Sequence, residues 1–345
     1  MFYADQGVKV NDKAQKLMLS AFALFATLLF CVGGVHANEK VTYRLKWLRN
    51  VSVIGALYAE SHHMFEKEGL DVDIKAGGPE RDAIRELELG YADFGEASAD
   101  QVLRARAKGS PVVVIAQLFQ VNPLQWMYRP EDGRIRNLSD LKGKVIGVTY
   151  GGNDETIMHT LLAEAGISGP EVTLFGVRYD YTPFYRHKVQ LWPVYRNAQG
   201  PIISAQLEKA GEQIAYLDPA EFGVQFVSNS VITESRTVAE KPELVKKFLS
   251  ALLAGWQKAL DPENQGEVIK TLQTYDPDTP RPILEEQLKS TRELVQPHLT
   301  VVIGAIDEKG WAQTEQIMRT QKQLAGEVDL KALLQPVNVS FKKGQ

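Results

Sequence analysis

The segment KGKVIGVTYGGNDETIMHTLLAEAG, Lys142 to Gly166, predicts a strand, a glycine turn and a helix in succession. The strand is the β-branched run around Ile146, and it ends at the Gly151-Gly152 pair. Asn153 or Asp154 can cap the helix that follows. The apolar residues of that helix lie at helical spacing: Ile157, Met158, Leu161, Leu162 and Ala165. Backbone N–H groups at such a turn suit an anionic or strongly polar ligand group. The alternative is an ordinary connection whose glycines serve only the turn.

The rest of the chain continues this alternation of strand and helix. Val41–Trp47 alternates apolar and polar residues like a half-buried strand, and Gly55–Glu68 has the spacing of a helix. Tyr91–Phe94 predicts another strand, and the unbroken apolar run Val112–Leu118 is typical of a buried parallel strand. Alternation at this rhythm predicts an α/β fold with a parallel sheet.

The order of the elements predicts two α/β lobes joined by two crossings. The chain changes character at Phe119–Pro123, becomes extended again at Val224–Ile232, and is almost all helix after Pro242. We expect lobe 1 to comprise residues 38–122 and 230–345, and lobe 2 to comprise residues 123–229. A ligand would then lie in the cleft between the lobes, at the carboxyl ends of the strands.

The N-terminal stretch, residues 1–37, predicts a secretory signal peptide cleaved after Ala37. Three lysines precede an apolar run from Leu17 to Val35, and Val35-His36-Ala37 resembles a cleavage site. The alternative is an uncleaved membrane anchor, because the run is nearly long enough to span a bilayer. Cleavage removes three Lys and two Asp, so that the net charge changes from −4 to −5.

Composition excludes several function classes. The hydrophobic content of 44% and the charged content of 24% are ordinary for a globular protein, and the net charge of −4 gives no sign of a nucleic-acid partner. Cys31 is the one cysteine, so a mature chain from residue 38 has no disulfide and no thiolate nucleophile. Bulky Phe30 before Cys31 disfavours lipidation. We expect no catalytic residue, no bound metal and no cofactor.

Several stretches occur in the order found in one protein family. They are Lys46-Trp47, GLDVDI at 69–74, LELGYADFGEASADQVLRARAKGSPVVVIAQLFQVNP at 87–123, NLSDLKGKVIGVTYGGNDE at 137–155, WPVYRN at 192–197 and KPELVKKFLSALLAGWQKAL at 241–260. Together they resemble the periplasmic solute-binding proteins of ABC importers, in the branch grouped with sulfonate, nitrate and taurine binders. The nearer likeness is to binders of thiamine-pyrimidine precursors.

This resemblance implies a two-lobed type II periplasmic binding fold, a periplasmic location and a monomer. It also implies a small-molecule ligand and, as partners, the membrane permease and ATPase subunits of an ABC importer. One departure affects the ligand. The family often shows Asn-Glu-Pro after the strand at Trp192–Tyr195, whereas this chain has Arg196, Asn197 and Ala198.

The candidate ligand-binding residues lie where strands end, at the first crossing, and at the glycine turn, where the family places its ligand. They are Trp47, Glu96, Ser98, Gln120, Asn122, Gly151, Gly152, Asn153, Asp154, Tyr179, Trp192, Tyr195 and Asn197. An indole at Trp47 can stack on a planar ligand. The acids Asp154 and Glu155 disfavour a multivalent anion at the turn, because like charges repel in a closed cleft.

Each of these residues also has a structural alternative. Trp47 can belong to a lobe core, Ser98 can cap a helix, and Gln120 and Asn122 can be plain hinge residues. About half of the aromatic side chains in the middle third are expected to serve packing alone.

Three function classes remain open. The first is a binding protein for a planar nitrogen heterocycle, with an alkyl sulfonate, nitrate or taurine-like anion as the alternative ligand. The second is a pyrimidine-synthesis enzyme of the same fold, although its cysteine-rich motif, a phosphate loop and a nucleophile elbow are all missing here. The third is a periplasmic sensor that docks on a membrane receptor.

Overall fold

The computed structural model describes residues 37–339. The apolar run of the predicted signal peptide and Cys31 lie outside these residues, so the structure does not test that prediction. Within the described part, no helix is long and apolar enough to cross a membrane.

The first sheet has five strands in the order β2-β1-β3-β10-β4. These strands are β1 (Glu39–Arg44), β2 (Leu70–Lys75), β3 (Phe94–Ala97), β4 (Val112–Gln117) and β10 (Ser230–Glu234). β1 is parallel to β2 and β3, whereas β10 is antiparallel to β3 and β4. The predicted parallel pairing therefore holds for β1, β2 and β3, whereas the antiparallel strand β10 departs from it. β4 is fully buried as expected. Its neighbour β10 follows the second sheet in the sequence and runs in the opposite direction.

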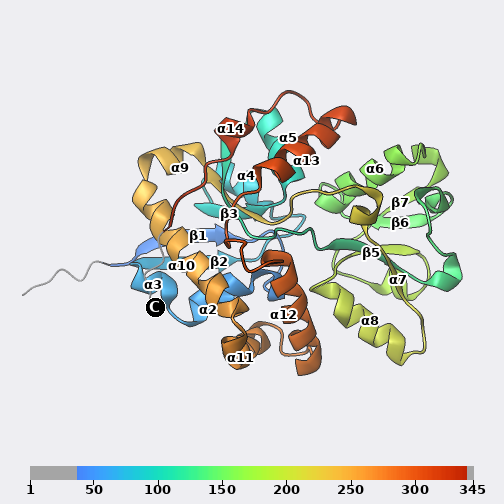
Figure 1. Cartoon of the computed structure of the whole chain (residues 1–345), viewed down its shortest axis with the longest axis horizontal. Helices are drawn as coiled ribbons and strands as arrows, with labels where there is room; N and C mark the ends of the chain where they lie inside the picture. Colours follow the sequence, from blue (N-terminus) through green and yellow to red (C-terminus); the bar gives the residue numbers. More distant parts are fainter. Residues whose placement is uncertain (1–36, 340–345) are drawn as a thin grey trace, which may run out of the picture. The chain divides into compact units, whose positions relative to one another are not determined.

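The second sheet also has five strands, in the order β7-β6-β8-β5-β9. Its strands are β5 (Leu124–Tyr128), β6 (Val145–Val148), β7 (Thr173–Gly176), β8 (Leu191–Tyr195) and β9 (Ala215–Leu217). β6 is parallel to β7 and β8, and β5 is antiparallel to β8 and β9. Figure 1 shows α6 (Asn153–Glu164), α7 (Thr182–Tyr185) and α8 (Gln199–Lys209) around this sheet.

The remaining helices accompany the first sheet. The N-terminal ones are α2 (Ile54–Ser61), α3 (Met64–Lys67), α4 (Ala83–Glu88) and α5 (Ala99–Ala107). The C-terminal ones are α9 (Ser235–Glu240), α10 (Pro242–Leu260), α11 (Gln265–Tyr275), α12 (Arg281–Val295), α13 (Glu308–Thr320) and α14 (Leu330–Leu333). The helical tail thus follows the predicted pattern, and its long helix α10 lies beside α2 and α3 in Figure 1.

Two local predictions are wrong. The helix expected over Gly55–Glu68 is broken after Ser61, because His63 adopts a left-handed backbone conformation with φ of 56°. The strand expected at Tyr91–Phe94 begins only at Phe94, since Tyr91 is exposed and belongs to the preceding turn. Glu96 therefore lies inside β3 rather than after it.

The two crossings are hydrogen-bonded to each other. Asn122 donates from Nδ2 to the carbonyl of Phe226 at 3.0 Å, and the N–H of Leu118 donates to the carbonyl of Asn229 at 2.9 Å. The strands of the first sheet come from residues 38–122 and 230–345, and those of the second from residues 123–229. We propose these ranges as the limits of the two lobes.

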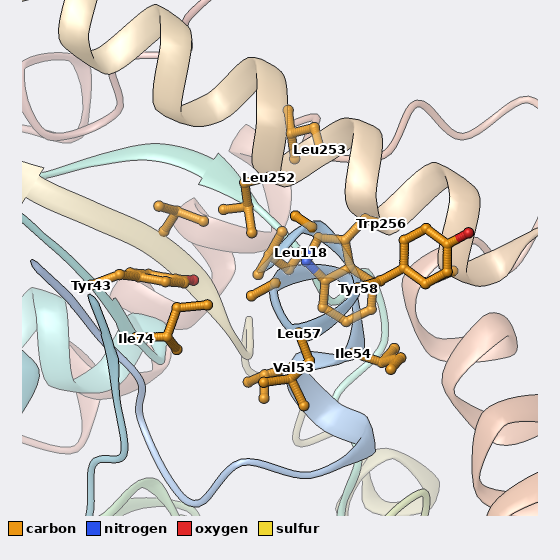
Figure 2. Packing of buried hydrophobic residues seen from close by; sticks show 14 of the residues in the cluster. Tyr43, Val53, Ile54, Leu57, Tyr58, Ile74, Leu118, Leu252, Leu253 and Trp256 are labelled. Carbon is orange, nitrogen blue, oxygen red and sulfur yellow. The ribbon is translucent and has the colours of Figure 1, made fainter. Parts of the chain in front are cut away.

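The core of the first lobe depends on close packing between α2 and α10. A Cβ atom added at Gly55 would lie 2.1 Å from Cγ of Trp256, and one added at Gly255 would lie 2.3 Å from the carbonyl oxygen of Gly55. Figure 2 shows Trp256 lying over the ribbon of α2. Trp256 is completely buried, so neither helix can accept a larger side chain at this contact without moving.

Gly55→Ala is expected to destabilise the protein by about 1–3 kcal/mol or more, because extra volume in a filled core forces side chains and backbone to shift. The measurement is chemical denaturation of the variant and the wild type. Gly266→Ala is the matched control, because Gly266 is an exposed residue of helix α11 with no atom within 4 Å of an added Cβ. That change should be neutral or stabilising by up to ~1 kcal/mol. Equal stability of both variants would contradict the packing described here.

Candidate functional site

A cavity of about 180 Å³ lies between the two sheets, and residues from both sides line it. The first side contributes the segment after β1, the start of α4 and the end of β3. The second side contributes the glycine turn before α6, the segment after β7 and strand β8. These are mostly the carboxyl ends of strands, where ligands bind in open α/β sheets.

Many of the predicted binding residues line this cavity. They are Trp47, Glu96, Gly151, Gly152, Asn153, Asp154, Trp192 and Tyr195. The structure thus brings together residues that are far apart in the sequence. Glu96 and Trp192 come from strands of different sheets, and Asn153 begins a helix.

The remaining predicted residues do not line the cavity, because their side chains have structural partners. Ser98 is fully buried in the cap of α5, where its hydroxyl contacts Gln101. Gln120 donates from Nε2 to the carbonyl of Ala305 at 3.0 Å, and Asn122 joins the crossings.

Asn197 and Tyr179 also lie outside the cavity wall. Asn197 is completely buried and donates from Nδ2 to Thr291 Oγ1 of α12 at 2.9 Å. Tyr179 is partly exposed, and its ring packs against the indole of Trp47 with 4.9 Å between centroids. Tyr179 thus supports a residue of the wall without facing the cavity.

Several lining residues were not predicted. They include Lys46, Asn50, Gln101, Thr149, Tyr181 and Asn229. Lys46 is the most informative of them. It directly precedes Trp47 at the end of the first strand, and this position could have indicated from the sequence that Lys46 lines the cavity. The others lie on turns or elements whose direction the sequence pattern does not reveal.

Glu96 is a buried acid with one free oxygen. Tyr43 donates from its hydroxyl to Glu96 Oε1 at 2.5 Å, and Oε2 has no hydrogen-bond partner within the described residues. Burial raises the pKa of Glu96 to about 7, although the Tyr43 hydrogen bond and the charge of Lys46 act in the opposite direction. A buried carboxyl oxygen without a partner is costly, so a ligand that donates to Oε2 would be favoured.

Lys46 connects the two sides of the cavity. Its Nζ donates to Asn153 Oδ1 at 2.9 Å and to the hydroxyl of Tyr195 at 2.5 Å. Lys46 follows β1 of the first sheet, whereas Asn153 begins α6 and Tyr195 ends β8. The ammonium group therefore places a positive charge beside Glu96 inside the cavity.

The N–H groups of the glycine turn are already in use, contrary to expectation. Gly151 donates to Glu155 Oε2 at 2.8 Å, Gly152 donates to the carbonyl of Thr149 at 2.7 Å, and Thr149 donates to Asp154 Oδ2 at 2.6 Å. Asp154 is buried, and burial raises its pKa to about 6. The protein's own acids thus occupy donors that a bound anion would need.

Aromatic side chains form much of the wall. Trp47 and Tyr195 are half-buried, Trp192 is almost completely buried, and Tyr181 lies next to Trp192 with ring centroids 5.8 Å apart. Such side chains offer flat apolar surfaces to a planar ligand. Within the described residues, no group of three acidic, histidine or cysteine side chains is placed to hold a metal ion.

Comparison with known proteins identifies relatives that match most of this chain. The family model described as NMT1/THI5-like matches residues 50–265. The formylaminopyrimidine-binding protein of Halalkalibacterium halodurans is 26% identical, over 73% of this chain and 75% of its own. The riboflavin-binding protein RibY of Chloroflexus aurantiacus is 25% identical, over 85% of this chain and 84% of its own. A 4-amino-5-hydroxymethyl-2-methylpyrimidine phosphate synthase of Saccharomyces cerevisiae is 28% identical, but over only 32% of this chain.

The fold prediction is confirmed by a solved structure. The alkanesulfonate-binding protein SsuA of Xanthomonas axonopodis pv. citri, bound to MOPS, superposes with a TM-score of 0.67. The match covers 87% of this chain and 99% of SsuA at 17% identity, so it establishes the two-lobed periplasmic binding fold and not the ligand. Because the family model covers more than half of the sequence, the chain belongs to the NMT1/THI5-like family.

Proposed function

We propose that this protein is the periplasmic substrate-binding component of an ABC importer. It captures a small planar nitrogen heterocycle, such as a thiamine-pyrimidine precursor, and delivers it unchanged to the permease. The names of two relatives, a formylaminopyrimidine-binding and a riboflavin-binding protein, support a heterocyclic ligand. The two relatives named as binding proteins cover 73% and 85% of this chain, more than the 32% and 63% covered by relatives named as synthases, which favours binding without turnover.

One observation carries the proposal: the aromatic cavity contains a buried carboxyl group with no partner for one oxygen. Trp47, Trp192 and Tyr195 can stack on a ring, while Glu96 Oε2 can accept a hydrogen bond from its edge. A planar heterocycle with an amino group uses both features. An aliphatic ligand fits these two features less well, because stacking on the aromatic wall is specific to flat π-systems.

The size of the cavity favours a single ring. A cavity of roughly 150 Å³ in an engineered protein holds benzene, and the volume here is about 180 Å³. A substituted pyrimidine matches this space, whereas the three fused rings of a flavin need a wider opening of the two lobes. We therefore favour a pyrimidine over a flavin.

The electrostatics disfavour a sulfonate or nitrate. These anions carry only acceptors, but the turn beside the cavity has its Gly151 and Gly152 N–H groups paired already. Two buried acids, Glu96 and Asp154, would also face the anion. Lys46 supplies one compensating charge, and two of its three N–H donors already have acceptors.

Native mass spectrometry of protein purified without refolding tests the proposal, because tightly bound ligands often survive purification. We expect an adduct whose mass fits a substituted single-ring heterocycle and which is released unchanged on denaturation. An adduct with the mass of an alkyl sulfonate, or catalytic formation of a product, would overturn the proposal.

Trp47→Ala is expected to weaken binding of 4-amino-5-hydroxymethyl-2-methylpyrimidine by at least about tenfold. Stacking contributes on the order of 1 kcal/mol per aromatic pair beyond burial, and tenfold corresponds to about 1.4 kcal/mol. Calorimetric titration measures the change. Tyr179→Ala is the control, because Tyr179 contacts Trp47 from outside the cavity and should cost less. A larger loss for Tyr179→Ala than for Trp47→Ala would show that the indole is not the stacking surface.

A further inference from the structure

The direction of the hydrogen bonds around Lys46 fixes which atoms of the cavity wall face a ligand. An ammonium group has three donors and no acceptor. Nζ of Lys46 lies 2.9 Å from the side-chain oxygen of Asn153, so the amide of Asn153 must turn its oxygen toward Lys46. Its nitrogen then points elsewhere, and Asn153 Nδ2 is buried without a partner in the described part of the chain. Asn153 lines the cavity, so this unpaired donor lies in the cavity wall.

The same direction continues through Tyr195. The hydroxyl oxygen of Tyr195 accepts from Lys46 at 2.5 Å, and its proton is directed toward Asn229 Oδ1 at 3.4 Å. Asn229 Oδ1 also accepts from the hydroxyl of Ser228 at 3.2 Å. Tyr195 therefore has no free proton for a ligand, and it acts on a ligand through its ring.

Glu96 supplies the opposite polarity. Its Oε1 accepts from Tyr43, and its Oε2 is buried in the cavity wall without a partner. Although burial raises the pKa of Glu96 to about 7, the carboxyl group is mostly ionised at pH 8, and the ionised form can only accept. The cavity wall therefore combines an unpaired donor at Asn153 with an unpaired acceptor at Glu96, beside the third N–H of Lys46.

We propose that Lys46 is a positioning residue that sets this donor–acceptor pattern and so determines which ligands the cavity accepts. A ligand must offer an acceptor to Asn153 and an N–H donor to Glu96, as the ring nitrogen and amino group of a 4-aminopyrimidine do. The inference rests on the proposed function, because it specifies the ligand class of the same site. An anion with acceptors only leaves Glu96 Oε2 without a donor.

A pair of ligands that differ in this pattern tests the proposal. The probes are 4-amino-5-hydroxymethyl-2-methylpyrimidine and its 4-oxo counterpart, whose ring N–H and carbonyl reverse the pattern at the same two positions. The quantity measured by calorimetry is the ratio of their affinities. Wild type should prefer the amino probe by at least about tenfold, because a mismatch leaves a buried polar group unpaired.

The ratio should depend on the donor at position 46. In Lys46→Met the amide of Asn153 is free to turn over, so the preference should fall below about threefold. Lys46→Arg is the matched control, since guanidinium is also a donor without acceptor and should keep the preference. A merely structural lysine would lower both affinities together and leave the ratio unchanged.

An unchanged ratio in Lys46→Met would overturn the inference while leaving the proposed function intact. Failure of both probes to bind wild type would instead contradict the proposed function. Should Lys46→Met fail to fold, Asn153→Asp provides the second variant, because it replaces the donor with an acceptor beside an unaltered Lys46. Asn153→Asp should then reduce the preference to below about threefold, because each probe meets one matched and one mismatched group, and retention of the wild-type ratio would overturn the inference.

Discussion

Glu96→Gln is expected to weaken binding of 4-amino-5-hydroxymethyl-2-methylpyrimidine by about 10- to 150-fold. A hydrogen bond to a charged group contributes about 1.5–3 kcal/mol, which corresponds to this range. The substitution keeps the size of the side chain. Because Tyr43 still donates to the oxygen at the Oε1 position, the new amide nitrogen takes the place of Oε2. The amide N–H of the new side chain would then point at the amino group of the ligand, so that two donors face each other and neither has an acceptor.

Glu155→Gln is the matched control for this prediction. Glu155 accepts from the N–H of Gly151 at 2.8 Å but does not line the cavity. Its replacement should change affinity by less than about threefold, since surface and rim contacts contribute little. The prediction is contradicted if the Glu96→Gln variant has the melting temperature of wild type and an affinity within twofold of it. The carboxyl group would then not contact the ligand.

The ligand-free protein is expected to gain stability as the pH is lowered from 8 to about 5. Burial raises the pKa of Glu96 from 4.5 to about 7 and that of Asp154 from 3.8 to about 6. An acid with a folded pKa above its unfolded value takes up its proton first in the folded state. The resulting stabilisation is complete below the unfolded pKa and is lost as the pH rises through about 6–7.

The expected size of this effect is about 2–3 kcal/mol for Glu96 alone between pH 5 and 8, at 1.36 kcal/mol per pKa unit. Chemical denaturation at several pH values measures it. Glu96→Gln removes the titrating group, so its stability should depend less on pH, with the part from Asp154 remaining. Parallel pH curves for wild type and Glu96→Gln would mean that Glu96 does not titrate as its burial implies.

The fold was largely predictable because the alternation of strand and helix patterns is repeated along the chain. The run Val145–Val148 and the helix from Asn153 form as expected, but the N-cap is Gly152 and not Asn153 or Asp154. The pairing of β10 between β3 and β4 was not predictable, since a short strand carries no mark of its direction. Likewise, nothing in the helical spacing of Gly55–Glu68 indicates that His63 adopts a left-handed conformation.

The site was predictable only in part, because the sequence does not show which polar side chains already have partners. Glu96 and Ser98 lie two residues apart and are both buried, yet Glu96 retains a free oxygen while Ser98 caps α5. Asn197 resembles a ligand contact in the sequence, but it bonds Thr291 in α12. Lys46 gains its importance from Asn153 and Tyr195, which are 107 and 149 residues away.

The central claim is that the cavity selects a planar heterocycle with an N–H donor over an anion. Calorimetric titration of the wild-type protein with 4-amino-5-hydroxymethyl-2-methylpyrimidine and with an alkyl sulfonate tests it most directly. We expect the pyrimidine to bind at least about tenfold more tightly, a difference of about 1.4 kcal/mol or more. Tighter binding of the sulfonate, with its affinity unaffected by Trp47→Ala, would contradict the account.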